Sequence, residues 1–201
     1  SLSPDPGRLL DLPEGFEYSV ISTIGEIMSD GLPVPGAHDG MAAFPGENGQ
    51  IVVIRNHEIS PAATWAGPYV DAVLDLPDKL RDKFYDLGEG KTPGLGGTTT
   101  TIYDPSTRTT VRQFLSLAGT EVNCAGGSTP WDSWLSCEES FGAPGAAKND
   151  AGVTVVREKR HGYIFEVPAS ARAPVDPVPL RDMGRFEHEA AAVHEKSGIV
   201  Y

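Results

Sequence analysis

The sequence predicts an all-β protein made of β-propeller-like repeats, with long loops inserted between short strands. The first observation is composition: 23 glycines and 17 prolines in 201 residues exceed average usage and indicate many tight turns. The second is a pattern that occurs three times: ligand-type polar residues, small residues, a short strand, a turn and another strand. Four short strands per unit are typical of propeller blades. The alternative is an ordinary all-β domain whose carboxylates shape turns.

Composition also narrows the range of partners. Charged residues make up 22% of the chain and hydrophobic residues 39%, as in ordinary globular domains. The net charge of −12 argues against nucleic acid, because a phosphate backbone needs a basic surface. A small phosphorylated substrate is compatible with this charge, since bound cations can reverse the local field. No apolar run approaches the length of a membrane span and no signal segment opens the chain, so we expect no membrane partner.

The N-terminal part combines irregular segments with one expected strand and one expected helix. Residues 1–15 are rich in Pro and Gly and predict an irregular arm. Phe16–Thr23 alternates well enough to predict a strand. Residues 60–96 are the least regular and are expected to form an insertion over one mouth of the domain. Within it, Asp75–Leu87 predicts a short helix, with Asp75 as a possible N-cap.

The remaining elements are expected to be strands. Ile51–Ile54 is β-branched and predicts a strand. Gly97–Tyr103 and Thr110–Leu117 flank the turn sequence Asp104-Pro105-Ser106-Thr107 and predict a hairpin. Gly162–Val167 predicts a further strand, which precedes the third copy of the pattern.

The three copies of the pattern begin with His38-Asp39-Gly40, Asn123-Cys124-Ala125-Gly126 and His188-Glu189-Ala190. In the first two copies the second strand ends in Asn56-His57-Glu58 and Cys137-Glu138-Glu139. Equivalent strand ends of successive blades gather around the central axis, so we expect these residues to meet at one mouth. Propellers have about four to eight blades. We therefore expect residues 1–201 to be the N-terminal portion of a larger propeller, whose C-terminal half is the partner that completes it.

Phosphate-ester hydrolysis is a reaction that such a mouth could support with metal ions. It is slow without a catalyst, and metals neutralise phosphoryl oxygens and activate water. Carboxylates suit calcium, whereas the Cys124 thiolate among oxygens favours a transition metal such as iron. The candidate carboxylate ligands are Glu58, Glu138, Glu139 and Glu189. Each has the alternative of being a surface or turn residue. Glu138 and Glu139 can both bind only if the strand has ended, because strand neighbours face opposite sides.

Four further residues have two possible roles. Arg55 and Arg185 are candidates to clamp a phosphate bidentately, or else to pair with the glutamates. Asp39 and Asn56 are possible ligands, although Asp and Asn are equally common in turns.

The cysteines and histidines have alternatives of their own. A Cys124–Cys137 disulfide would explain both cysteines without a metal. As a nucleophile, Cys124 would need one of His38, His57 or His188 as a base. For each histidine a structural hydrogen bond is the more common role.

Several of these motifs also resemble those of a known family. The stretches are LPEGFEYSVIS (12–22), DGMAAFPG (39–46), VIRNHE (53–58), GGTTT (96–100), SLAGTEVNCAGGSTPWDSWLSCEES (116–140), HGYIFEVP (161–168) and GRFEHEAAAV (184–193). Through them the chain resembles the PhoX-type alkaline phosphatases over essentially its whole length. The resemblance implies a β-propeller enzyme of about six blades that hydrolyses phosphomonoesters at a cluster of iron and calcium. It also implies export by the twin-arginine route, and hence a periplasmic or extracellular location.

The resemblance further implies a ligand set. Cys124 would be the iron thiolate, and the glutamates named above would supply carboxylates. Two departures stand out: Glu187 occupies a position where a small residue is expected, and family members draw further ligands and a phosphate-binding arginine from a second half. The alternatives to a phosphatase are a non-enzymatic, calcium-stabilised propeller that binds a partner, and an inactive fragment of the phosphatase.

Overall fold

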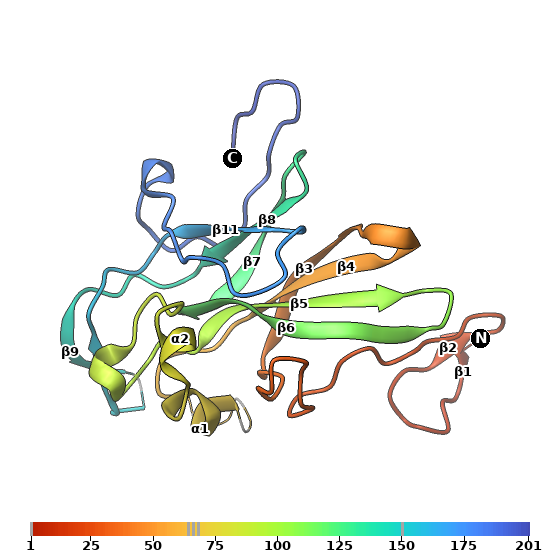
Figure 1. The fold of residues 1–201 in the computed structure, drawn as a ribbon, viewed down its shortest axis with the longest axis horizontal. Coiled ribbons are helices and arrows are strands. Elements are labelled where there is room, and N and C mark those ends of the chain that lie inside the picture. The colour runs from red at the N-terminus through yellow and green to blue at the C-terminus, as the bar shows by residue number, and fades with distance from the viewer. Residues whose placement is uncertain (1, 64, 66, 68, 150) are drawn as a thin grey trace.

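The computed structural model describes residues 2–63, 65, 67, 69–149 and 151–201. These residues are mostly β with few helices, which confirms the all-β class (Figure 1). The strands are β1 Leu2–Ser3, β2 Leu12–Pro13, β3 His38–Pro45, β4 Ile51–His57, β5 Gly96–Asp104, β6 Thr109–Thr120, β7 Asn123–Ser128, β8 Ser133–Glu138, β9 Gly145–Lys148, β10 Thr154–Arg157 and β11 Ile164–Pro168. The α-helices are α1 Tyr69–Leu74 and α2 Asp78–Arg81, and the 3₁₀ turns are η1 Glu47–Gly49, η2 Gly88–Gly90 and η3 Arg181–Met183.

The first sheet is a four-stranded antiparallel meander in the order β3-β4-β5-β6. β4 lies in its interior, where its β-branched residues pack on both faces. The strands expected from the sequence at 51–54, 97–103 and 110–117 are confirmed and lie within β4, β5 and β6. The hairpin of β5 and β6 completes this first sheet, so the four strands of one repeat unit are hydrogen-bonded neighbours.

The second sheet has the order β7-β8-β11 and is also antiparallel. Phe165 in β11 makes a further antiparallel bridge to Pro179, which brings a fourth segment to the sheet edge. The strand expected at 162–167 is confirmed as β11. β9 and β10 form a separate hairpin in the loop between β8 and β11.

The three copies of the sequence pattern lie side by side. A Cβ on Gly40 in β3 would lie 2.7 Å from the Ala125 Cα in β7. On the other side of β7, the Ala125 N–H donates to the Glu189 carbonyl at 3.1 Å, and a Cβ on Gly127 would lie 2.1 Å from the Ala191 carbonyl oxygen. Residues without a Cβ allow backbones to approach this closely. The strands that the structure describes form no closed ring, so the propeller stays a prediction.

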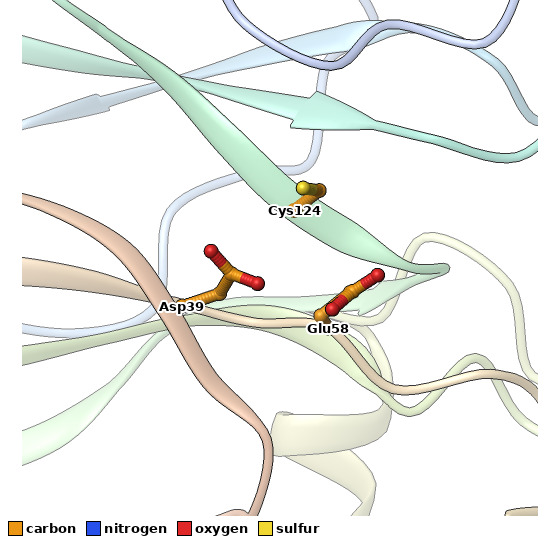
Figure 2. Close-up of side chains that lie close together, drawn as sticks. All are labelled: Asp39, Glu58 and Cys124. Carbon is orange, nitrogen blue, oxygen red and sulfur yellow. The ribbon is translucent and has the colours of Figure 1, made fainter.

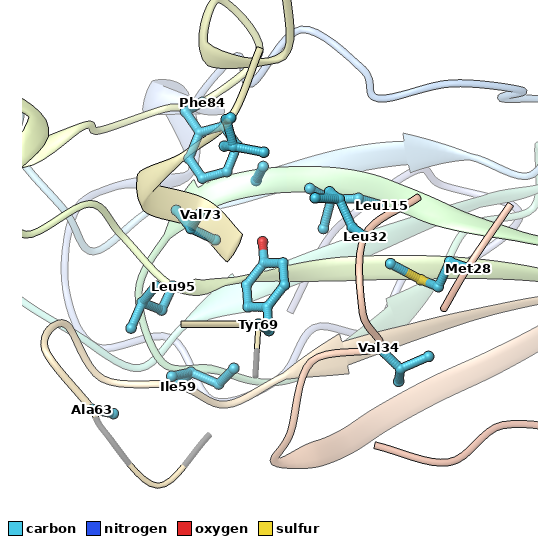
Figure 3. Close-up of a cluster of buried hydrophobic side chains, with 12 residues drawn as sticks. Met28, Leu32, Val34, Ile59, Ala63, Tyr69, Val73, Phe84, Leu95 and Leu115 are labelled. Atoms are coloured by element: carbon cyan, nitrogen blue, oxygen red, sulfur yellow. The ribbon is translucent and has the colours of Figure 1, made fainter. Parts of the chain in front are cut away.

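Three buried apolar clusters hold these parts together. The first lies where the inserted stretch packs on the first sheet, with Tyr69 of α1 and Phe84 against Leu115 of β6 (Figure 3). The second lies between the two sheets, where Ile54 and Leu117 share a cluster with residues such as Phe165 of β11. The third is smaller and lies on the second sheet. The insertion therefore supplies part of the core.

Two expectations for the N-terminal half are wrong. Phe16–Thr23 forms no strand, and its large side chains are exposed, Phe16 by 69%. Alternation alone builds a strand only if the backbone pairs with a sheet edge, and here the contacts with the first sheet run through side chains. The Thr110 hydroxyl donates to the Ile21 carbonyl, and the Arg55 and Gln113 side chains donate to the Ser22 hydroxyl. The helix expected at Asp75–Leu87 is shorter, because Pro77 lacks an N–H and the helix α2 begins after it.

Residues 2–15 contain the short antiparallel pair of β1 and β2 and are otherwise irregular. The arm and the insertion include residues 1, 64, 66 and 68, which lie outside the described residues. Within the described chain, no helix has both the length and the apolar character that a membrane span requires.

Candidate metal centre

A β-bulge sets the direction of Cys124. In the β7–β8 pair, Asn123 lies opposite Glu138 and Gly126 lies opposite Ser136, so two residues of β7 face one residue of β8. Cys124 is one of these two residues. Bulges redirect side chains and occur often beside functional sites.

The β3–β4 pair contains an equivalent irregularity. His38 lies opposite His57 and Met41 opposite Arg55, so Asp39 and its neighbour face a single residue of β4. Asp39 thus occupies in β3 the place that Cys124 occupies in β7.

Four carboxylate side chains gather around Cys124. Asp39, Glu58 and Cys124 place one ligand atom each within 4.8 Å of one another, and so do Cys124, Glu139 and Glu189. Figure 2 shows Asp39 from β3 and Glu58 from the end of β4 on the side of β7 that carries Cys124. The Cys124 Sγ lies 3.7 Å from the Glu189 Oε1. The three strand openings and two strand ends therefore contribute to one cluster, as the repeat pattern predicts.

The cluster carries negative charge without a matching cation. Within the described part of the chain, none of its four carboxylates takes part in an ion pair. Burial, followed by the charges of the surrounding carboxylates, raises the pKa of the Cys124 thiol to about 12. Burial also raises the pKa of Glu58, as do its hydrogen bond with Asp39 and the neighbouring carboxylates. A bound cation would reverse both effects, because it favours the ionised forms.

The chemistry of this donor set fits a metal centre. Four carboxylates offer the oxygen ligands that calcium prefers. The Cys124 sulfur is a softer ligand and favours a transition metal such as iron. Both groups share Cys124, so the five side chains form one cluster around this sulfur.

Glu138 does not belong to this cluster, and the ligand role expected for it is corrected. Its side chain is fully buried on the opposite side of the strand end from Glu139. The Glu138 carboxylate accepts hydrogen bonds from the Glu121 N–H at 3.0 Å, the Gly162 N–H at 2.8 Å and the Tyr163 N–H at 3.1 Å. The physical reason is the alternation of strand neighbours, which allows one glutamate of the pair to face the thiol.

The fourth partner of Glu138 is His161. The His161 Nδ1 donates to the Glu138 Oε1 at 2.7 Å, and its Nε2 donates to the Asp86 Oδ2 at 3.1 Å. Burial alone would lower the pKa of His161. Its hydrogen bonds to Asp86 and Glu138 and the charges of Glu138 and Glu121 outweigh burial and raise the pKa to about 9. Arg157 pairs with Glu121 at 2.7 Å, so two cations, His161 and Arg157, offset much of the charge of the three carboxylates in this buried network.

The two arginines expected to bind phosphate are engaged elsewhere. The Arg55 Nη2 donates to the Ser22 hydroxyl at 3.0 Å, and its buried Nε has no hydrogen-bond partner among the described residues. Arg185 donates from Nε to the His161 carbonyl at 2.9 Å and from Nη2 to the Gly142 carbonyl at 2.6 Å. Arg185 thus uses Nε and Nη2 on backbone carbonyls, whereas Arg55 is held through one Nη, and the phosphate-binding role expected for both stays a prediction.

The structure also decides several alternatives for the remaining polar residues. Both cysteines are free, and Cys137 packs with Leu135 in an apolar cluster, so no disulfide joins it to Cys124. His57 is buried between the Gly36 carbonyl and the Thr99 hydroxyl, which is the structural role.

Asn56 is structural as well. Its amide nitrogen donates to the Ala125 carbonyl at 2.7 Å, and its oxygen accepts from the Trp134 ring N–H at 2.9 Å. Asn56 thereby ties β4 to β7 and β8 of the second sheet.

The set of site residues expected from the sequence omits Asp39 and His161. Asp39 appears among the possible ligands but not in the expected ligand set, because an Asp before a glycine is equally typical of a turn. Its parallel position to Cys124 at the opening of a repeat is the signal that identifies it. His161 is missing because its partners Glu138 and Asp86 lie 23 and 75 residues away in the sequence.

Comparison with known proteins identifies the family. Searches of curated proteins and of solved structures return no match. The family model described as alkaline phosphatase PhoX matches residues 1–201, the whole chain. The chain therefore belongs to the PhoX alkaline phosphatase family.

Proposed function

We propose that the chain is a metal-dependent phosphomonoesterase whose centre at Cys124 holds iron and calcium. The observation that carries this proposal is the convergence of four carboxylates without a cation on a single thiol, in a chain of an alkaline phosphatase family. A cluster of like charges is costly unless ions bind to it. The thiol and the four carboxylates are thus the side chains that support a metal-dependent phosphatase function in this chain.

Each side chain of the centre has a distinct role in this proposal. The Cys124 sulfur would hold iron, with Glu139 and Glu189 beside it. Asp39 and Glu58 supply the oxygen-rich side of the same centre, which suits calcium. When bound, such metals neutralise phosphoryl oxygens and activate water.

The carboxylates also control access of the substrate. A phosphomonoester is a small dianion, and four unpaired carboxylates repel it unless cations are bound. Substrate binding therefore depends on prior metal binding, and the protein without metal has no affinity for the phosphate group. This dependence separates the proposed centre from an ordinary acidic surface.

We also propose that the two sheets are successive blades of a propeller. The meander β3-β4-β5-β6 begins at the strand nearest to β7, and β7 in turn lies beside the segment of Glu189. Inner strands of neighbouring blades have this arrangement around an axis. The site then lies where the inner strands meet, and a small phosphorylated substrate enters at that mouth.

The test compares metal content and phosphatase activity in matched variants. The protein is purified without chelators, its iron and calcium are measured, and hydrolysis of an aryl phosphate is followed. Cys124→Ser should lose most of its iron and at least about 100-fold in kcat, because the softer ligand is gone. Glu139→Gln should lose metal affinity by about tenfold or more.

Cys137→Ala is the matched control, since Cys137 is a free thiol in an apolar cluster. It should keep its metals and its activity. Calcium without iron and no turnover in the wild-type protein would instead favour the non-enzymatic, calcium-stabilised module. Equal activity in Cys124→Ser and in the wild type would refute the role of the thiol.

A further inference from the structure

The buried network behind the metal centre is joined to the ligand segments through Glu138. Asp86, Glu121 and Glu138 are each no more than 2% exposed, and His161 is fully buried among them. Such a concentration of buried charge is expensive to maintain. The network therefore calls for an explanation beyond packing, and the position of Glu138 supplies one.

We propose that Glu138, held by His161, is a positioning residue that aims three ligands of the centre, Cys124, Glu139 and Glu189, at one point. The inference rests on the proposed metal centre and assigns to it a role for residues that do not touch a metal. Cys124 and Glu189 each follow a residue whose backbone lies against that of Glu138, and Glu139 follows Glu138 itself.

The first connection is through β7. Asn123 is the residue paired with Glu138 in the ladder, and Cys124 follows it directly. The Asn123 side chain is itself fixed, because its oxygen accepts from the Thr120 hydroxyl at 2.6 Å and its nitrogen donates to the Ser136 hydroxyl at 2.9 Å. The bulge that turns Cys124 toward the carboxylates thus starts from the Glu138 position.

The second and third connections are through neighbours of Glu138 in sequence and in space. Glu139 follows Glu138 and donates its N–H to the Val122 carbonyl at 2.9 Å. The Glu138 carbonyl accepts the His188 N–H at 2.8 Å, and Glu189 is the next residue. With the Glu138 side chain fixed inward, alternation turns the Glu139 side chain outward to the thiol.

Four donors prevent the Glu138 side chain from moving. The three N–H groups come from two segments, one at Glu121 and one at Gly162 and Tyr163. His161 is the fourth donor, and its other nitrogen bonds to Asp86. Asp86 in turn accepts the N–H groups of Gly88 and Lys159, so the insertion and the β10–β11 loop are tied into the same support. Outer contacts of this kind orient metal ligands and are worth about 10–100-fold in metal affinity.

The experiment replaces Glu138 with an isosteric amide and measures binding of Co²⁺ to the metal-free full chain. In Glu138→Gln the amide nitrogen replaces one of the two oxygens. It therefore faces either the Glu121 N–H and His161 or the N–H groups of Gly162 and Tyr163, so the side chain cannot satisfy all four donors. We expect Co²⁺ affinity to fall by about 10–100-fold. The thiolate-to-cobalt absorption at saturation should weaken as well, because Cys124 is no longer aimed at the metal. Leu117→Ala, which removes a buried side chain between the sheets, is the control for lost stability and should leave affinity within about twofold.

A second measurement does not depend on metal. Hydrogen exchange of the metal-free protein should show faster exchange in Glu138→Gln at the N–H groups of Ala125, Glu139 and His188, with β4 and β5 unchanged. If Glu138→Gln does not fold, His161→Gln takes its place, with an expected loss of about tenfold in Co²⁺ affinity.

Unchanged Co²⁺ affinity in the folded variant would overturn the positioning role, and so would an equal loss in Leu117→Ala. A wild-type chain that binds no metal would instead sink the proposed function. In that case the exchange pattern alone decides the positioning: local acceleration at the three N–H groups supports it, and uniform or absent acceleration refutes it.

Discussion

Glu138 and Glu139 are neighbours in the chain and lie in opposite electrostatic environments. Glu138 accepts four hydrogen bonds in the buried network, and His161 balances its charge. Glu139 lies beside the Cys124 thiol among carboxylates that, within the described residues, form no ion pair. Alternation along a strand predicts from the sequence that the two glutamates differ. Which of them faces the thiol depends on the register with β7, and that register is a tertiary feature.

The raised pKa of His161 predicts how stability depends on pH. Its pKa is about 9 in the folded chain and 6.5 in a free histidine, so folding favours the protonated form. The stabilisation is fully present below pH 6.5 and is lost as pH rises through 9, by up to about 3 kcal/mol. Unfolding free energies of metal-free wild type and His161→Gln, measured by denaturant between pH 6 and pH 10, should converge with rising pH. Parallel curves would show that His161 is not protonated in the folded state.

The two bulged strands and their small residues form the frame of the centre. Asp39 in β3 and Cys124 in β7 are both placed by bulges, and Gly40 lets the two backbones approach. The sequence identifies most strands of both sheets, since β-branched residues and alternation are local signals. It misplaces a strand at Phe16–Thr23 and a helix at Asp75–Leu87. The first forms no backbone ladder with the edge strand β6 and the second is limited by Pro77, so both errors come from context beyond the periodic pattern.

Gly40→Ala tests the close approach of β3 and β7. The added methyl group would lie 2.7 Å from the Ala125 Cα and 3.0 Å from the Cys124 carbonyl oxygen, so the strands must separate. We expect a loss of about 1–3 kcal/mol in unfolding free energy and a lower metal affinity, because Asp39 moves away from the thiol. Gly7→Ala in the N-terminal arm is the control and should change stability by less than about 0.5 kcal/mol. If Gly40→Ala binds metal as tightly as the wild type, the close approach of β3 and β7 does not place Asp39 beside the thiol.

Asn56→Ala tests the link between the two sheets. The fully buried side chain donates to the Ala125 carbonyl and accepts from the Trp134 ring and the Ser136 hydroxyl. Its removal leaves these partners unsatisfied inside the protein, so we expect a loss of about 2–4 kcal/mol by denaturant unfolding. A loss under about 0.5 kcal/mol would mean that water replaces the amide without cost.

The whole chain is arranged so that segments far apart in sequence support one cluster of ligands. The insertion carries Asp86 into the network behind the centre and Tyr69 into the first apolar cluster. The repeat pattern predicts from the sequence that strand openings and strand ends meet. The buried network escapes prediction, because no local pattern relates His161 to its distant carboxylates.

Metal binding should therefore stabilise the whole fold. Ions that relieve the repulsion among the four carboxylates bind to the folded chain and not to the unfolded one. With free metal at 100 times its Kd, the gain is about 2.7 kcal/mol. Calorimetry should show a higher Tm with calcium and iron than after chelation. An unchanged Tm would indicate that the cluster holds no ion.

The most direct test of the proposed centre is X-ray absorption at the iron edge of protein purified without chelators. The wild type should show a sulfur neighbour together with oxygen neighbours, and the sulfur signal should disappear in Cys124→Ser. Iron with oxygen and nitrogen neighbours alone, or a wild-type protein without iron, would show that Cys124 is not the ligand around which the centre is built.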